Sequence, residues 1–228
     1  MTRRLLAAAP AAFVLGTALA ACAGGGRNAA TARPVVAPSG AITRGEFARR
    51  LVEANNRLWF DEPGKQIRPS NYGAQAFPDV PPSHADYAYL QALAAAGYAT
   101  AFADGTFRPD APLTREEMLA LKEAVDRGGV DRYYENAWRA NVPYRDAAAL
   151  GPRYRGAIAE DAALDRYARA HGTPALALDN VRRAFGSGAT LRPQQPVTPA
   201  QAGRVLGKIG GHTPNVVTLA PGDAPRGR

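Results

Sequence analysis

Two segments of this chain repeat one pattern 84 residues apart. Residues 106–114 read TFRPDAPLT, and residues 190–198 read TLRPQQPVT. Both threonines, the arginine and both prolines recur in place, and apolar residues replace apolar residues. A repeat at a fixed offset predicts a recurring supersecondary unit whose copies stack and bury a shared core.

Two shorter matches extend the repeat along the chain. ITRGE at residues 42–46 echoes LTREE at residues 113–117, and FPDV at residues 77–80 echoes YRDA at residues 144–147 with an offset of 67. Because 67 is 17 less than 84, the last copy holds about 17 extra residues, somewhere within residues 164–183. We therefore predict a repeat domain over residues 41–209. Its copies are partial at residues 41–55, full at residues 77–125 and degenerate at residues 144–209.

Each copy contains a threonine suited to begin a helix. Thr43, Thr114 and Thr198 each precede a glutamate or glutamine by three residues, which is the spacing of a capping box. Apolar residues at helical spacing follow each threonine, and further helices are expected over about residues 85–96 and from near Arg153. The fold class is therefore predicted to be mostly α.

Two aspartates stand just before helices. Asp79 precedes the helix expected over residues 85–96, and Asp146 precedes its counterpart in the last copy. Aspartate is a favoured residue at helix starts because its carboxylate accepts hydrogen bonds from free backbone N–H groups. Both are interpreted as helix start signals.

The first 21 residues have the pattern of a bacterial export signal. Arg3 and Arg4 precede an apolar run that ends in LAA, directly before the single cysteine, Cys22. This ending is similar to a lipobox, which implies cleavage before Cys22 and modification with three acyl chains such as palmitate. Such chains anchor a protein to a membrane. Ala23, in place of an aspartate after the cysteine, favours the outer membrane.

Segments of low complexity flank the repeats. Residues 22–40 are rich in alanine, glycine and proline and are expected to form a flexible tether between lipid and domain. Residues 210–228 are rich in glycine and proline and are expected to be a disordered tail.

The charge of the chain is carried mainly by arginine. The formal net charge is +8, which becomes +6 without the first 21 residues, and 25 of the 28 basic residues are arginine. Arginine suits bidentate recognition of carboxylate or phosphate, although genome base composition explains the same bias. Nucleic acid is not expected as a partner of an exported chain.

A series of fixed points runs through residues 77–125. They are FPDVPPSH at residues 77–84, Tyr87, Gly97, DGTFRP at residues 104–109 and LTREE at residues 113–117. Together they resemble the S-layer homology repeat. The resemblance implies a pseudo-threefold helical prism of three repeats, which binds cell-wall glycan, often anionic, in grooves between them.

This chain departs from the family pattern at three places. Ala85 stands where the family usually has a tryptophan, and Ala101 stands where it has a glycine. TPAQ at residues 198–201 lacks the arginine of the family motif. Stacking of a sugar on that tryptophan is therefore absent from the full copy.

The ligand-binding residues are expected at the helix starts. Arg44 and Arg115 directly follow Thr43 and Thr114, so their guanidinium groups would lie beside free backbone N–H groups that favour an anion. The alternative is that the threonines only cap the helices and the arginines are solvated flanks. Thr198 keeps the cap without an arginine, so capping is the shared requirement.

Asp104 and Gly105 are further candidates for ligand contact. Their more direct interpretation is a turn that needs a positive φ. No His, Cys or Asp cluster has metal-ligand spacing, and no nucleophile elbow, phosphate loop or nucleotide fingerprint occurs. Neither a metal, a cofactor nor an enzyme activity is therefore expected.

The sequence thus favours a non-catalytic lipoprotein that binds anionic cell-wall polysaccharide and tethers a membrane to the wall. The alternative is a structural scaffold whose degenerate repeats dock an envelope protein partner. Loss of the tryptophan, and of the arginine in the last copy, favours this alternative somewhat.

Overall fold

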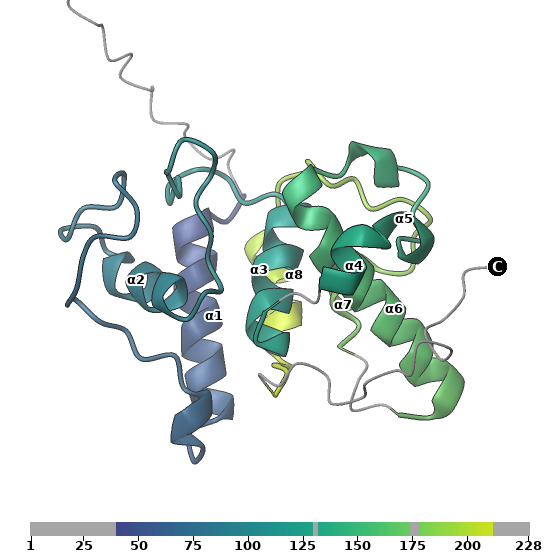
Figure 1. The fold of residues 1–228 in the computed structure, drawn as a ribbon, viewed down its shortest axis with the longest axis horizontal. Coiled ribbons are helices and arrows are strands. Elements are labelled where there is room, and N and C mark those ends of the chain that lie inside the picture. Colours follow the sequence, from purple (N-terminus) through teal and green to yellow (C-terminus); the bar gives the residue numbers. More distant parts are fainter. Residues whose placement is uncertain (1–39, 130–131, 174–177, 212–228) are drawn as a thin grey trace, which may run out of the picture. The chain divides into compact units, whose positions relative to one another are not determined.

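The computed structural model describes residues 40–129, 132–173 and 178–211. Cys22, the export signal and the tether up to residue 39 lie outside these residues, as does the tail from residue 212. The described residues form helices and loops and contain no strand, which confirms the mostly α class (Figure 1). The α-helices are α1 (Arg44–Leu58), α2 (Tyr87–Ala95), α3 (Arg115–Arg127), α4 (Arg132–Asn136), α5 (Trp138–Asn141), α6 (Arg155–His171), α7 (Asn180–Phe185) and α8 (Pro199–Leu206). The short 3-10 helices are η1 (Pro63–Lys65), η2 (Ala147–Ala149) and η3 (Pro152–Tyr154).

The three predicted helix starts are confirmed. Helices α1, α3 and α8 begin directly after Thr43, Thr114 and Thr198. The Thr43 hydroxyl accepts a hydrogen bond from the Glu46 N–H at 3.1 Å, and the other two threonines form capping boxes with Glu117 and Gln201. Each cap satisfies a backbone donor that would otherwise lack a partner in the first helical turn.

Backbone hydrogen bonds join the three copies in a closed ring just before these helices. The Leu113 N–H donates to the Ile42 carbonyl at 2.9 Å, the Val197 N–H donates to the Leu113 carbonyl at 2.8 Å, and the Ile42 N–H donates to the Val197 carbonyl at 2.9 Å. These residues occupy equivalent positions in the repeat, and all three side chains are buried. The ring therefore brings the starts of α1, α3 and α8 together in the core.

The extra residues of the last copy lengthen its first helix. Helix α6 has 17 residues, whereas its counterpart α2 in the full copy has nine, and α7 follows α6. Helix α6 packs against α3, α4 and α5, while α7 packs against α8. The range predicted for the insertion thus includes the C-terminal part of α6 and the start of α7, both labelled in Figure 1.

Neither aspartate caps a helix through its side chain, so the carboxylates do not have the predicted role: Asp79 lies in a turn, and Asp146 precedes the 3-10 helix η2 without a side-chain cap hydrogen bond. The Asp79 carboxylate accepts hydrogen bonds from the N–H of Arg108 at 2.6 Å and of the residue before it at 2.8 Å. Asp146 makes the same pair of bonds to Arg192, at 2.6 Å, and to the residue before it, at 2.9 Å. Arg108 and Arg192 have φ angles of 59° and 54°, which residues with a side chain rarely adopt. Each aspartate therefore holds the strained loop of its own copy.

The chain is held at Gly210, where the sequence indicated the beginning of the tail. The Gly210 N–H donates to Asp126 Oδ1 at 2.9 Å, and its carbonyl accepts from the Trp59 indole at 3.1 Å. A Cβ at Gly210 would lie 2.2 Å from the backbone oxygen of Asp126, so a larger residue does not fit there. These contacts tie the end of the repeat domain to α3 and to the residue that follows α1.

Candidate ligand groove

Arg44 begins α1 and is buried against the loop of the full copy. Its Nη1 lies 2.6 Å from Glu117 Oε1, and its Nε donates to the Phe107 carbonyl at 2.9 Å. The guanidinium group also lies over the rings of Phe102 and Phe107, within 5 Å of both centroids. The interpretation of Arg44 as a solvated flank is therefore wrong, because its charge is balanced inside the protein.

Arg115 occupies the equivalent position at the start of α3. Its Nη1 donates to the Leu191 carbonyl at 2.8 Å, and its guanidinium group lies over the ring of Phe185. Gln201 takes the place that Glu117 has in the other copy, and Arg115 forms no ion pair within the described residues. Burial, together with the charge of Arg192, lowers the pKa of Arg115. Arg115 is thus a buried cation without a carboxylate partner.

The backbone donors at these helix starts are already bound. The first two N–H groups of α1 donate to carbonyl oxygens of residues 109 and 111, at 2.8 and 3.0 Å. The first two N–H groups of α3 donate to carbonyl oxygens of residues 193 and 195, both at 3.1 Å. The expectation that they are free to bind an anion is therefore wrong, because the loop of the next copy uses them.

Asp104 and Gly105 form a turn in the loop of the full copy. The Asp104 carboxylate accepts hydrogen bonds from the N–H and the hydroxyl of Thr106, at 3.0 and 2.6 Å, and from Arg108 Nη2 at 2.8 Å. These bonds to Thr106 and Arg108 lower the pKa of Asp104. Gly105 has a φ of 81°, which glycine adopts without strain. The side chain of Asp104 is half exposed, at the edge of the loop.

A cavity of about 280 Å³ opens beside Arg44 and Glu117. Residues of all three copies line it, because Arg44 comes from the first copy, Glu117 from the full copy and Arg153 and Tyr154 from the last. Tyr98 and the residues after it complete its wall. We call this cavity the ligand groove.

Arg153 is an exposed cation at the ligand groove. Its Nη2 donates to the carbonyl and to the hydroxyl of Thr100, both at 2.8 Å, and its guanidinium group lies over the rings of Phe102 and Tyr154. No described carboxylate forms an ion pair with it. Burial raises the pKa of the Tyr154 hydroxyl, which keeps it neutral. The lining also includes Glu135, which forms no ion pair with Arg153 among the described residues. The groove therefore offers an arginine without an ion-pair partner beside an aromatic surface.

Sequence reasoning did not select Arg153 or Tyr154. The offset of 67 aligns them with Asp86 and Tyr87 of the full copy. The exchange of an acid for an arginine at this position was the available signal, but no sequence pattern indicates that η3 places this arginine in the same cavity wall as Arg44.

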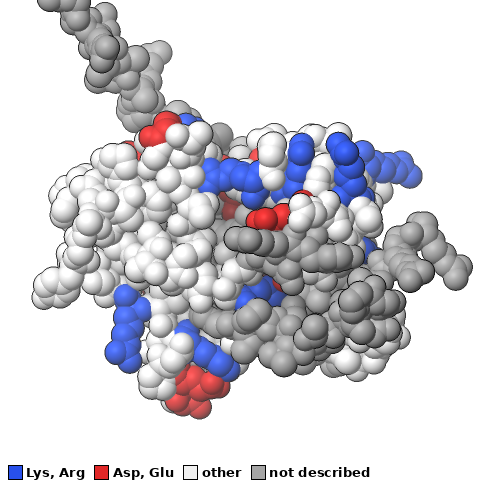
Figure 2. All heavy atoms as spheres, viewed as in Figure 1, with Lys and Arg blue, Asp and Glu red and all other residues white. Residues whose placement is uncertain are grey.

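Basic side chains form a row on one face of the molecule. Figure 2 shows a row of Lys and Arg side chains across the upper part of the viewed face, with few Asp and Glu side chains between them. Figure 1 draws α5 and the loops of the last copy in this part of the view. An anionic polymer would be attracted to such a surface.

In the described ranges, no group of three or more His, Cys, Asp or Glu side chains could hold a metal ion. No helix in those ranges has the length and hydropathy needed to cross a membrane.

Comparison with known families supports the resemblance. The sequence model of the S-layer homology domain matches residues 76–119, which include Asp79, Asp104, Gly105 and the LTREE motif at residues 113–117. No curated protein matches this chain. S-layer homology domains bind cell-wall polymers and act at the cell envelope. This chain therefore carries an S-layer homology domain at residues 76–119.

Proposed function

We propose that this protein binds an anionic cell-wall polysaccharide in the ligand groove and holds a membrane close to the wall. The observation that carries the proposal is Arg153, an exposed guanidinium group without a carboxylate partner, beside Tyr154 at a groove of about 280 Å³. An arginine in this state suits bidentate bonding to a sugar carboxylate or phosphate, and an aromatic neighbour suits the apolar face of a sugar ring.

The copies are proposed to form a pseudo-threefold prism. The hydrogen-bonded ring of Ile42, Leu113 and Val197 supports this arrangement, because each copy donates to one neighbour and accepts from the other. The positions of Arg44 and Arg115 support it further, since each contacts the loop of the next copy through an equivalent carbonyl. In this proposed prism a groove would lie at each junction between copies, and the cavity beside Arg44 and Glu117 is taken as one of them.

The two buried arginines have different roles in this account. Arg44 is paired with Glu117, and both residues line the ligand groove, so Arg44 forms part of its wall. Arg115 has no such ion pair. At its position, where the full copy meets the last copy, an anionic group of the ligand is proposed to supply the negative charge. Thr43, Thr114, Asp104 and Gly105 hold the helix starts and the loop that form these walls.

The membrane attachment is proposed at Cys22. Lipidation there and a tether over residues 22–40 would keep the repeat domain within roughly 60 Å of the membrane, since each extended residue spans about 3.3 Å. Outer-membrane attachment fits the alanine that follows the cysteine. The lipid and the groove together make the protein a link between membrane and wall.

One observation favours docking of a protein partner instead. Leu58 and Phe60, at the end of α1, are 44% and 74% exposed. Exposed large apolar side chains of this kind often mark contact surfaces. Crosslinking in cells distinguishes the two functions, because wall binding yields products that remain with the sacculus and docking yields discrete protein adducts.

Sedimentation with purified wall material tests the proposed function. The protein is expected to sediment with sacculi that carry their anionic polymers and to stay in solution when those polymers have been stripped. Binding should weaken as salt rises, because salt screens the contact with arginine. Equal sedimentation with both preparations would contradict recognition of an anionic polymer.

A further inference from the structure

A second cavity lies in the last copy and includes residues that the other copies lack. Its volume is about 210 Å³, and it is lined by Pro143, Tyr144 and residues of α6, of α7 and of the segments that flank α7. This volume is below the range of roughly 300–1,000 Å³ that is usual for drug-sized ligands. The cavity therefore suits a group the size of a single amino acid.

The floor of this cavity carries carboxylates without cationic partners. Asp161 is 2% exposed, and its Oδ2 has no hydrogen-bond donor among the described residues. Its Oδ1 accepts only from the amide of Asn180, at 3.1 Å. Asp165, one turn further along α6, accepts from the N–H of Asp179 at 3.0 Å. Neither Asp161 nor Asp165 forms an ion pair in the described part of the chain.

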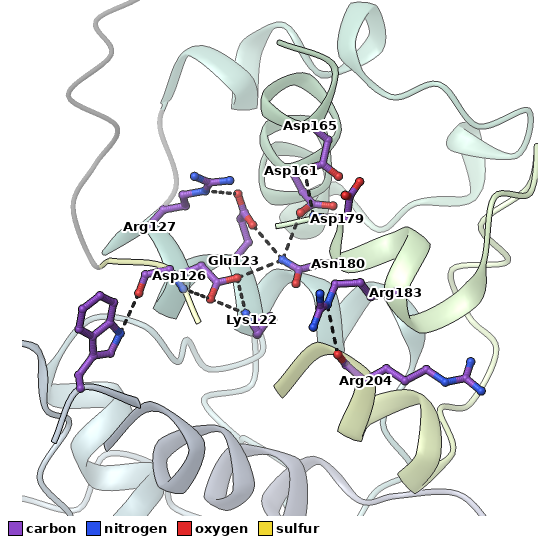
Figure 3. A network of polar contacts seen from close by, with 12 residues as sticks. Lys122, Glu123, Asp126, Arg127, Asp161, Asp165, Asp179, Asn180, Arg183 and Arg204 are labelled. Carbon is purple, nitrogen blue, oxygen red and sulfur yellow. Dashed lines mark hydrogen bonds and ion pairs between the residues drawn. The ribbon is translucent and has the colours of Figure 1, made fainter. Parts of the chain in front are cut away.

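The cations near this floor are already engaged (Figure 3). Lys122 is paired with Asp126, and Arg127 Nε lies 3.0 Å from Glu123 Oε1. Burial therefore raises the pKa of Asp161 to about 6, and burial together with Asp161 raises that of Asp165 to about 7. The charged and titratable groups around the two aspartates are Lys122, Glu123, Asp126, Arg127, Tyr144, Asp179, Arg166 and Arg169.

The rim of the cavity has the opposite charge. Arg166 donates to the carbonyl and the amide oxygen of Asn141, at 2.7 and 3.0 Å, and both acceptors are neutral. Arg169 and Arg182 share one carboxylate, that of Asp179, at 2.7 and 3.6 Å. The rim thus holds three guanidinium groups and one acid, whereas the two carboxylates of the floor form no ion pair among the described residues.

We propose that this cavity binds a small zwitterion, with an ammonium group on Asp161 and Asp165 and a carboxylate on Arg166 and Arg182. An α-amino acid carries the two charges that these groups would bind, a positive ammonium group for the floor and a negative carboxylate for the rim. The ligand is either a free amino acid or the free amino-acid centre of a cell-wall peptide, since both present the same two groups. This cavity is separate from the ligand groove, so the proposal stands independently of glycan binding.

Calorimetric titration of the full chain, purified in detergent, tests this proposal with four probes. Alanine carries both charged groups, methylammonium and acetate carry one each, and a muramyl tripeptide that ends in diaminopimelate presents the amino-acid centre on a wall fragment. Alanine or the tripeptide is expected to bind at least about tenfold more tightly than either single-charge probe, because each charged contact contributes roughly that factor. Whichever of the two binds more tightly identifies the source.

Variants and pH sharpen the test. Asp165→Asn and the rim variant Arg182→Gln, which is exposed and leaves the core intact, should each weaken binding about tenfold, whereas the control Asp110→Asn, in a distant exposed loop, should not. Affinity should rise from pH 5 to pH 8 as the floor carboxylates ionise. Failure of the wild-type chain to bind alanine and the tripeptide at millimolar concentration would overturn the proposal, as would unchanged affinity in both variants.

Discussion

Arg44 of the first copy and Glu117 of the full copy form a buried ion pair, with Arg44 Nη1 and Glu117 Oε1 2.6 Å apart. The other oxygen of Glu117 accepts from the Thr114 N–H at 2.9 Å, so one carboxylate closes a capping box and joins two copies. The repeat motif thus encodes contact between copies as well as a helix start.

Replacement of Glu117 should destabilise the fold strongly. Glu117→Gln keeps an acceptor for Thr114 but leaves the Arg44 guanidinium buried without a counter-charge, which typically costs about 3–5 kcal/mol. Urea unfolding should report this loss in the free energy of unfolding. Glu53→Gln removes an exposed carboxylate from α1 and should change stability by less than about 0.5 kcal/mol. Equal effects of the two variants would contradict the role given to the pair.

Restoration of the carboxylate in the last copy should stabilise the fold. Gln201 has the position of Glu117, and the Thr198 N–H donates to its side-chain oxygen at 3.0 Å. Gln201→Glu keeps that bond and supplies a negative charge toward Arg115, for an expected gain of about 1 kcal/mol. A lower unfolding midpoint in urea would show that Arg115 and position 201 do not face one another as Arg44 and Glu117 do.

Asp79 and Asp146, which hold the loops, should contribute equally to the free energy of unfolding. Asp79→Asn and Asp146→Asn each replace an anion that accepts two backbone N–H bonds beside a residue with positive φ. Each substitution is expected to cost about 2 kcal/mol, because hydrogen bonds to a charged acceptor are worth more than neutral ones. Thermal or urea unfolding measures this cost. A loss of stability in only one of the two variants would show that the aspartates do not hold their loops in the same way.

Stability should fall as pH rises between about 4 and 7. The pKa of Asp161 is raised to about 6 and that of Asp165 to about 7, while both carboxyls titrate near 4 in the unfolded chain. The folded state therefore binds more protons in this window, and its free energy of unfolding declines by on the order of a few kcal/mol as pH increases. Asp146 has a lowered pKa, so its contribution to stability is lost as pH falls below about 4.

Urea titrations at several pH values measure this dependence. Asp165→Asn should flatten the decline, because the amide carries no titrating proton. If the free energy of unfolding changed with pH by the same amount in the wild-type chain and in Asp165→Asn, titration of Asp165 would not contribute to this dependence.

The helices could be predicted from the sequence because their signals are local. A threonine with an acid or amide three residues later marks each of α1, α3 and α8, and apolar spacing marks their buried faces. The 17-residue insertion followed from two offsets, and α6 is longer than α2 as that arithmetic requires.

The contacts between copies could not be predicted, because they join residues that are distant along the chain. Phe107 and Arg44 are 63 residues apart, and no local pattern indicates that the loop of one copy covers the helix start of another. The same reason explains the error at Asp79. Its carboxylate reaches forward 29 residues to Arg108 rather than to the helix that follows it.

The most direct test of the central claim compares two arginine variants in sedimentation with wall polymer. Arg153→Gln removes the unpaired charge at the ligand groove, and the control Arg57→Gln removes an exposed arginine in the last turn of α1 that does not line the groove. We predict that Arg153→Gln lowers affinity about tenfold, as expected for loss of one charge-assisted contact, with unchanged helical circular dichroism. Arg57→Gln should bind as the wild-type chain does. Equal binding by both variants would contradict recognition of an anionic glycan at this groove.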